Sequence, residues 1–177
     1  MLADRRSIRC LGIDPGIGRM GFGLVAQAGS TLTAVEYGCI ETPPGDLLQK
    51  RLLCLFSSLE EIFHRVSPDF LAVERLYFGR NTTTAEAVWQ ARGVVLLLAA
   101  QRGLEVFQPK PAEVKMAVAG NGNATKAQVQ HMVCEILRLP APPRPDDVSD
   151  ALAIALTGLA IRSVQSRLNP AGGPAPC

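Results

Sequence analysis

Four acidic residues stand at positions from which their side chains could meet. Asp14 closes the apolar stretch CLGID, and Glu74 directly follows the apolar stretch FLAV. An acid on an otherwise buried segment is costly unless it is paired or binds a cation. Asp147 and Asp150 are three residues apart, so on a helix their side chains share one face. Taken singly, each acid is also explained as a turn residue or a helix cap, but together they favour a shared site.

Carboxylates without a nearby His or Cys are the ligands that suit Mg²⁺ or Mn²⁺. Clustered carboxylates repel one another strongly unless a cation lies among them. Two such ions in each subunit could activate a water molecule on one side of a phosphodiester and stabilise the leaving oxygen on the other. The acidic set therefore predicts metal-dependent hydrolysis of a phosphodiester.

Basic residues are concentrated in the middle of the chain. The formal net charge is +2, but between Arg75 and Pro145 nine Lys and Arg residues stand against four Glu, a local excess of five positive charges. Directly after Glu74 the sequence RLYFGRN interleaves aromatic and basic residues, a combination that can stack on bases while contacting phosphates. The predicted DNA-binding residues are Tyr77, Phe78, Arg80, Lys115 and Lys126. The alternatives are that the aromatics belong to the core and that the lysines are ordinary surface residues.

A glycine pattern near the N-terminus has two interpretations. Gly16 to Gly21 matches the G-x-G-x-x-G pattern of dinucleotide-binding proteins, and Glu36 lies near the distance at which a ribose-binding acid would be expected. That mechanism requires a helix after the glycines, whereas the following GFGLVAQAG is β-like. We therefore expect these glycines to form a tight hairpin.

The pattern of apolar residues predicts three β-like runs followed by alternating strands and helices, which is typical of an α/β fold. The predicted strands are Ile8 to Asp14, Gly21 to Ala28, Leu32 to Ile40, Phe70 to Val73 and Leu104 to Phe107. The predicted helices are Asp46 to Val66 with Asp46 as N-cap, Thr84 to Arg102, Pro109 to Ala119, a helix opened by a capping box at Thr125 and running through Leu137, and Asp147 to Arg167.

Length and composition predict one compact domain in a reducing compartment. The chain has 177 residues, 47% of them hydrophobic, which suits a single domain over residues 1–168 with a disordered tail over 169–177. Its five cysteines are an odd number without a C-x-x-C pair, as expected of an intracellular protein. No secretory signal or membrane-length apolar run is seen, so we expect a cytoplasmic location and no membrane partner.

Five motifs in order closely resemble the RuvC family of Holliday junction endonucleases. They are GIDPG at 12–16, VERLYFGRN at 73–81, QARG at 90–93, KAQVQHMV at 126–133 and DALAIAL at 150–156. The resemblance extends from about Ile8 to Arg162, which is nearly the whole chain.

The resemblance implies an RNase H-like fold of the integrase superfamily, with a mixed five-stranded sheet flanked by helices. It also implies a homodimer that resolves four-way junctions by paired symmetric nicks, with Mg²⁺ or Mn²⁺ as cofactor and RuvA and RuvB as partners in recombination and repair. The family's acidic site falls on Asp14, Glu74, Asp147 and Asp150, its basic positions on Lys115 and Lys126, and its stacking residue on Tyr77, with Phe78 adjacent.

Two features leave room for other interpretations. Asp146 and Asp147 both precede Asp150, and we expect Asp147 to be the ligand and Asp146 the N-cap, although Asp146 could substitute. A junction-binding module without catalysis is the main alternative function, but it would lack one of the acids. A nucleotide-binding domain is a further alternative, because GIDPG also resembles the first phosphate loop of actin-like ATPases.

Overall fold

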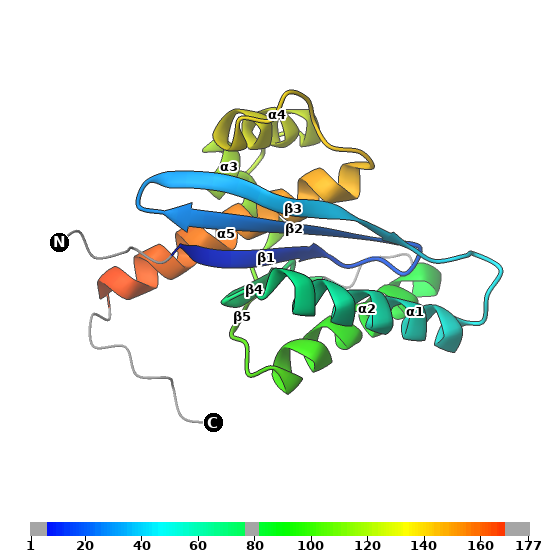
Figure 1. Ribbon diagram of the computed structural model, residues 1–177. Helices are drawn as coiled ribbons and strands as arrows, with labels where there is room; N and C mark the ends of the chain where they lie inside the picture. The colour runs from blue at the N-terminus through cyan, green and yellow to red at the C-terminus, as the bar shows by residue number, and fades with distance from the viewer. Residues whose placement is uncertain (1–6, 77–81, 169–177) are drawn as a thin grey trace.

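The computed structural model describes residues 7–76 and 82–168, which form one five-stranded sheet with helices on both faces (Figure 1). The strands are β1 (Ile8–Asp14), β2 (Arg19–Ala28), β3 (Thr31–Glu41), β4 (Phe70–Val73) and β5 (Val106–Phe107). The helices are α1 (Leu48–Val66), α2 (Thr82–Gln101), α3 (Pro111–Ala119), α4 (Lys126–Leu137) and α5 (Asp146–Leu168).

The sheet is mixed, with strand order β3-β2-β1-β4-β5. The three β-like runs predicted at the start of the chain form an antiparallel meander, while β4 joins β1 and β5 joins β4 in parallel. Because β2 returns antiparallel to β1, with Asp14 opposite Gly21, the glycine pattern forms a hairpin. The helix that a dinucleotide fold would need at this point is replaced by β2, so the hairpin expectation is confirmed.

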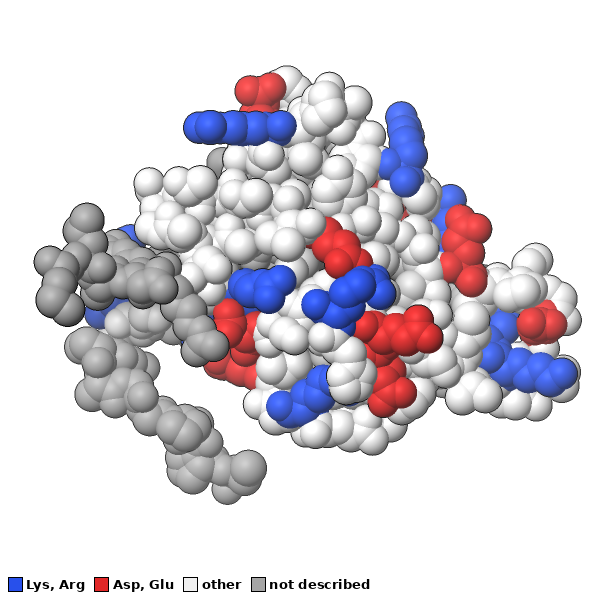
Figure 2. Space-filling model, in the orientation of Figure 1, with Lys and Arg blue, Asp and Glu red and all other residues white. Residues whose placement is uncertain are grey.

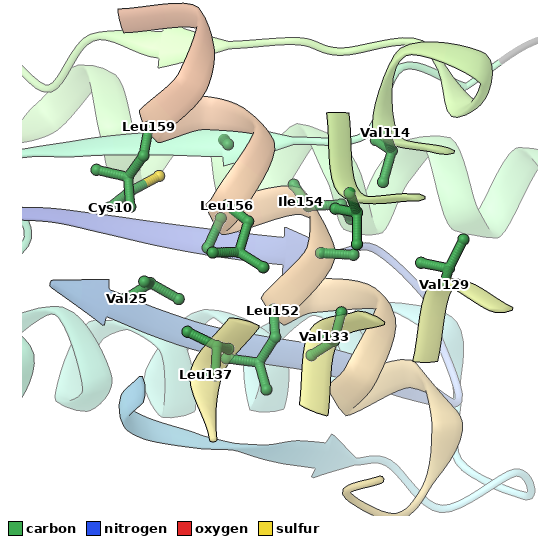
Figure 3. Close-up of a cluster of buried hydrophobic side chains, with 14 of the residues drawn as sticks. Cys10, Val25, Val114, Val129, Val133, Leu137, Leu152, Ile154, Leu156 and Leu159 are labelled. Carbon is green, nitrogen blue, oxygen red and sulfur yellow. The ribbon is translucent and has the colours of Figure 1, made fainter. Parts of the chain in front are cut away.

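Successive side chains along each strand point to opposite faces of the sheet, and this divides the core into two layers. Leu11 and Val73 face the layer that contains α1 and α2, whereas Cys10 and Ala72 face the layer of α3, α4 and α5. Figure 3 shows side chains of α5 and α4 packed over the second face, above Cys10 and Val25. Since successive strand residues point to opposite faces, Asp14 lies on the α5 side of the sheet.

Helix α5 lies unusually close to β1 and β2 because glycines face it. A methyl group added to Gly12 would lie 2.1 Å from the carbonyl oxygen of Ala151, and one added to Gly21 would lie 2.1 Å from the carbonyl oxygen of Asp147. No side chain fits in these gaps, so backbone meets backbone. This contact sets the distance of the first turns of α5 from the end of β1.

The helix starts are partly as predicted. Thr125 caps α4, accepting a hydrogen bond from the backbone N–H of Gln128, whose side chain bonds back to Thr125. The prediction that Asp46 caps α1 is wrong: the N-cap is Leu47, without a side-chain bond, and the Asp46 N–H donates to Pro43 O in a turn. The prediction that Asp146 caps α5 is also wrong, because Asp146 is already the first helical residue.

Some expectations fall on parts of the chain that the structure does not describe. Tyr77, Phe78, Arg80 and the predicted tail over residues 169–177 all lie outside the described residues. Within residues 7–76 and 82–168, no helix is long and apolar enough to cross a bilayer.

The α5 contact predicts a stability effect at Gly12. We expect Gly12→Ala to lower the free energy of unfolding by about 1–3 kcal/mol or more, because the new methyl group must push the α5 backbone away from β1. Urea unfolding measures the change. Gly45→Ala is the matched control, since nothing lies within 4 Å of a methyl group there. Equal unfolding midpoints for the two variants would contradict the proposed contact.

Candidate active site

The parallel pairing of β1 and β4 brings two acids together at one edge of the sheet. Ile13 pairs with Val73, so Asp14 and the following Glu74 stand side by side where the two strands end. Helix α5 crosses this edge and adds Asp150, and these three acids line a cavity of about 300 Å³. Lys115 and Lys126 line the same cavity, from α3 and α4.

The acids in this cavity resist ionisation. Burial, and then the negative charges of Asp150, Glu74 and Asp147, together raise the pKa of Asp14 to about 7 against the opposing charge of Lys126. Burial also raises the pKa values of Glu74 and Asp150, and Asp150 adds its repulsion to Glu74. Such mutual repulsion is what a bound cation would relieve.

Lys126 forms ion pairs with two carboxylates at the start of α5. Its Nζ lies 2.8 Å from Asp150 Oδ2 and also contacts Asp146 Oδ2. Although partial burial opposes its charge, the hydrogen bonds that Lys126 donates to Asp146 and Asp150 raise its pKa. The same hydrogen bond lowers the pKa of Asp146. Asp146 is therefore a partner of Lys126 in this structure, a contact that the sequence did not indicate.

Asp147 lies next to the cavity and has a different cationic neighbour. Arg19 Nε, at the start of β2, lies 3.2 Å from Asp147 Oδ2. That oxygen is buried, and in the part of the chain that the structure describes it has no hydrogen-bond partner. Sequence reasoning missed Arg19; the available signal was its place in the glycine-rich turn that directly follows Asp14.

The acids share a cavity but do not form a ready metal-binding group. Among the described residues, no three His, Cys, Asp or Glu side chains are placed to hold a metal ion. Two of the acids are held instead by cationic side chains, Asp147 by Arg19 and Asp150 by Lys126.

The basic excess of the middle segment is not confined to one surface. Lys115 and Lys126 reach the cavity, but Arg92 is only 8% exposed and donates a hydrogen bond to Gln108. Arg102 lies 3.9 Å from Glu60. Figure 2 shows Lys and Arg side chains lying among Asp and Glu side chains on the visible face. The sequence count therefore overstated the basic surface, because α2 carries Arg92 inward.

Comparisons with known proteins agree on one family. The family model described as crossover junction endodeoxyribonuclease RuvC matches residues 10–158. The RuvC of Pelotomaculum thermopropionicum is 52% identical over 146 residues, covering 82% of this chain and 89% of the relative. The RuvC of Chloroflexus aggregans is 51% identical over 149 residues, covering 84% of this chain and 91% of the relative.

Solved structures show the same fold. Thermus thermophilus RuvC in complex with a Holliday junction substrate superposes with a TM-score of 0.84 at 36% identity, covering 90% of this chain and 97% of that one. The yeast mitochondrial resolvase Ydc2, at 15% identity, shares the fold with a TM-score of 0.64, covering 91% of this chain and 84% of that one. The RNase H-like fold expected from the motifs is thus confirmed, and the chain belongs to the RuvC family of crossover junction endodeoxyribonucleases.

Proposed function

We propose that this protein resolves Holliday junctions by paired symmetric nicks, hydrolysing phosphodiesters to leave 5′-phosphate and 3′-hydroxyl ends. The observation that carries the proposal is the cavity in which Asp14, Glu74 and Asp150 meet Lys115 and Lys126. Carboxylates that can bind a cation thus lie beside amines that can bind a phosphate. The solved complex of the Thermus thermophilus relative with a Holliday junction supports the choice of substrate.

The acidic residues suit a divalent metal ion, and the family is metal-dependent. We assign Asp14, Glu74, Asp147 and Asp150 as its ligands and Mg²⁺ or Mn²⁺ as the metal, with two ions in each subunit. The donors are all carboxylate oxygens, the buried oxygen of Asp147 lacks a hydrogen bond, and burial together with repulsion raises the pKa of Asp14. Bound at such a site, the metal supplies a more acidic water and stabilises charge on the leaving oxygen.

The choice of Asp147 over Asp146 as a ligand follows from their surroundings. The Asp147 side chain is 22% exposed and its negative charge raises the pKa of Asp14, whereas the Asp146 side chain is 38% exposed and is not among the charges that act on Asp14. A ligand must present a carboxylate oxygen towards the other acids. These differences support Asp147 as the ligand.

In this proposal the predicted basic and aromatic residues bind and orient the DNA. Lys115 and Lys126 contact phosphates at the cavity, while Tyr77 and Phe78 stack on bases at the junction and Arg80 contacts the backbone. Two symmetric nicks require two copies of the site, so we propose a homodimer. From the family resemblance we also propose RuvA and RuvB as partners. From the cysteine usage we propose a cytoplasmic location.

Junction selectivity gives the first test. We expect the protein to nick a labelled four-way junction at opposing strands in Mg²⁺ or Mn²⁺, to leave a linear duplex of matched sequence largely uncut, and to be inactive in EDTA. Denaturing gels measure both products. Equal cleavage of the duplex and the junction would contradict the proposal, and so would junction binding without any cleavage.

A second test separates catalysis from binding. We expect Asp150→Asn to lower the cleavage rate by at least about a hundredfold while junction binding is retained, because it removes a metal ligand but no phosphate contact. A gel-shift assay in Ca²⁺ and a cleavage assay in Mg²⁺ measure the two effects. Glu135→Gln, at an exposed carboxylate of α4, is the control and should cleave normally. Full activity of Asp150→Asn would exclude the assignment.

A third test follows from the pKa of Asp14. This pKa is about 7 in the folded protein against an ordinary value of 3.8, so the folded state holds a proton that the unfolded state has released between these pH values. The contribution of Asp14 to the stability of the metal-free protein should therefore fall as pH rises from 4 to about 7, and Asp14→Asn should remove this fall.

At pH 8 in EDTA, we expect Asp14→Asn to raise the free energy of unfolding by about 1–3 kcal/mol relative to the unmodified protein. At pH 4 the difference should nearly disappear, because Asp14 is then protonated in the folded protein and is as neutral as Asn. Urea unfolding at the two pH values measures this, with Glu135→Gln as the neutral control. Lower stability of Asp14→Asn at pH 8 would contradict the repulsion described above.

A further inference from the structure

Lys126 lies among carboxylates that the proposed function assigns partly to metal. Of its two partners, Asp150 is a proposed ligand and Asp146 is not. Lys126 is the first residue of α4, and Asp146 is the first residue of α5, so each side chain projects from a helix start. The amine of Lys126 thus bridges Asp150, which is a proposed metal ligand, and Asp146, which is not.

We propose that Lys126 is a built-in counter-ion that occupies Asp150 in the metal-free protein, and that Asp146 is the positioning residue that retains the lysine when a divalent ion takes Asp150. This inference rests on the proposed metal site. It gives Asp146 a role that neither a ligand nor a helix cap would have.

The contacts support competition between lysine and metal. Lys126 Nζ lies 2.8 Å from Asp150 Oδ2, which is hydrogen-bond distance, so that oxygen is already used. Two like charges cannot share one carboxylate oxygen closely, so a metal ion must displace the amine or bind more weakly. The Lys126 side chain is 53% exposed, which leaves it room to move.

The position of Asp146 supports the retaining role. It contacts the same amine, and its carboxylate is more exposed than that of Asp150. When Lys126 leaves Asp150, its contact with Asp146 keeps the positive charge at the edge of the cavity. There it remains available to the phosphate of a DNA strand.

The test measures Mn²⁺ affinity without DNA, by electron paramagnetic resonance of free Mn²⁺. We expect Lys126→Met to bind Mn²⁺ about fivefold more tightly, since binding no longer breaks an ion pair. Lys115→Met is the matched control, because it removes the same charge from the same cavity but a different amine. The gain in Mn²⁺ affinity of Lys115→Met should be clearly smaller than that of Lys126→Met. Equal gains in the two variants, or no gain in Lys126→Met, would overturn the proposal.

The role of Asp146 is tested by a double-mutant cycle. We expect Asp146→Asn to weaken Mn²⁺ binding about twofold to threefold, because Lys126 then stays on Asp150, and Asp146→Glu to restore it. In the Lys126→Met background the loss should be at most half as large. An undiminished loss in that background would identify Asp146 as acting directly on the metal, and no loss in either background would exclude its retaining role.

The outcomes for this inference and for the proposed function can be told apart. If the unmodified protein binds no Mn²⁺ at all, the metal site itself is wrong. If it binds Mn²⁺ and Lys126→Met behaves like Lys115→Met, only the inference about Lys126 fails. Urea unfolding of each variant shows whether it is folded, and a purely structural role for Asp146 would change this stability without changing the Mn²⁺ affinities.

Discussion

The direct backbone contact between α5 and the strands β1 and β2 is the constraint on which the site depends. At Gly12 and Gly21 there is no room even for a methyl group. This close approach places the first turns of α5 beside the ends of β1 and β4, where the strand acids project. Residues of α5 from Val148 to Leu159, apart from Asp150, are buried, so the packing of the core and the position of Asp150 are parts of one contact.

Concentrating acids at this edge works against stability. Burial and repulsion raise the pKa of Asp14 to about 7, because the charged form is disfavoured in a site with three other carboxylates. Two cations from separate elements partly offset this repulsion: Arg19 of β2 pairs with Asp147, and Lys126 of α4 pairs with Asp150. A pKa shifted this far is typical of sites in which electrostatics serves function rather than folding.

The proposed exchange of Lys126 for a metal ion gives the site two arrangements. In the one described, Lys126 pairs with Asp150, and among the described residues no group of three possible ligands is placed to hold a metal ion. A residue that pairs with a ligand in one state and with phosphate in another can link metal binding to substrate binding. Asp146 matters in this view because it limits how far the amine can move.

The sequence by itself determined most of the elements and the types of the candidate site residues. Local patterns suffice for these: the strand-end positions of Asp14 and Glu74, the i, i+3 spacing of Asp147 and Asp150, and the capping box at Thr125 depend only on near neighbours. Only the tertiary structure decided which charges pair. Arg19 with Asp147 and Lys126 with Asp146 are contacts between residues distant in sequence, and whether Arg92 is buried depends on packing around α2. Such pairings follow from how helices dock on the sheet, which no local pattern encodes.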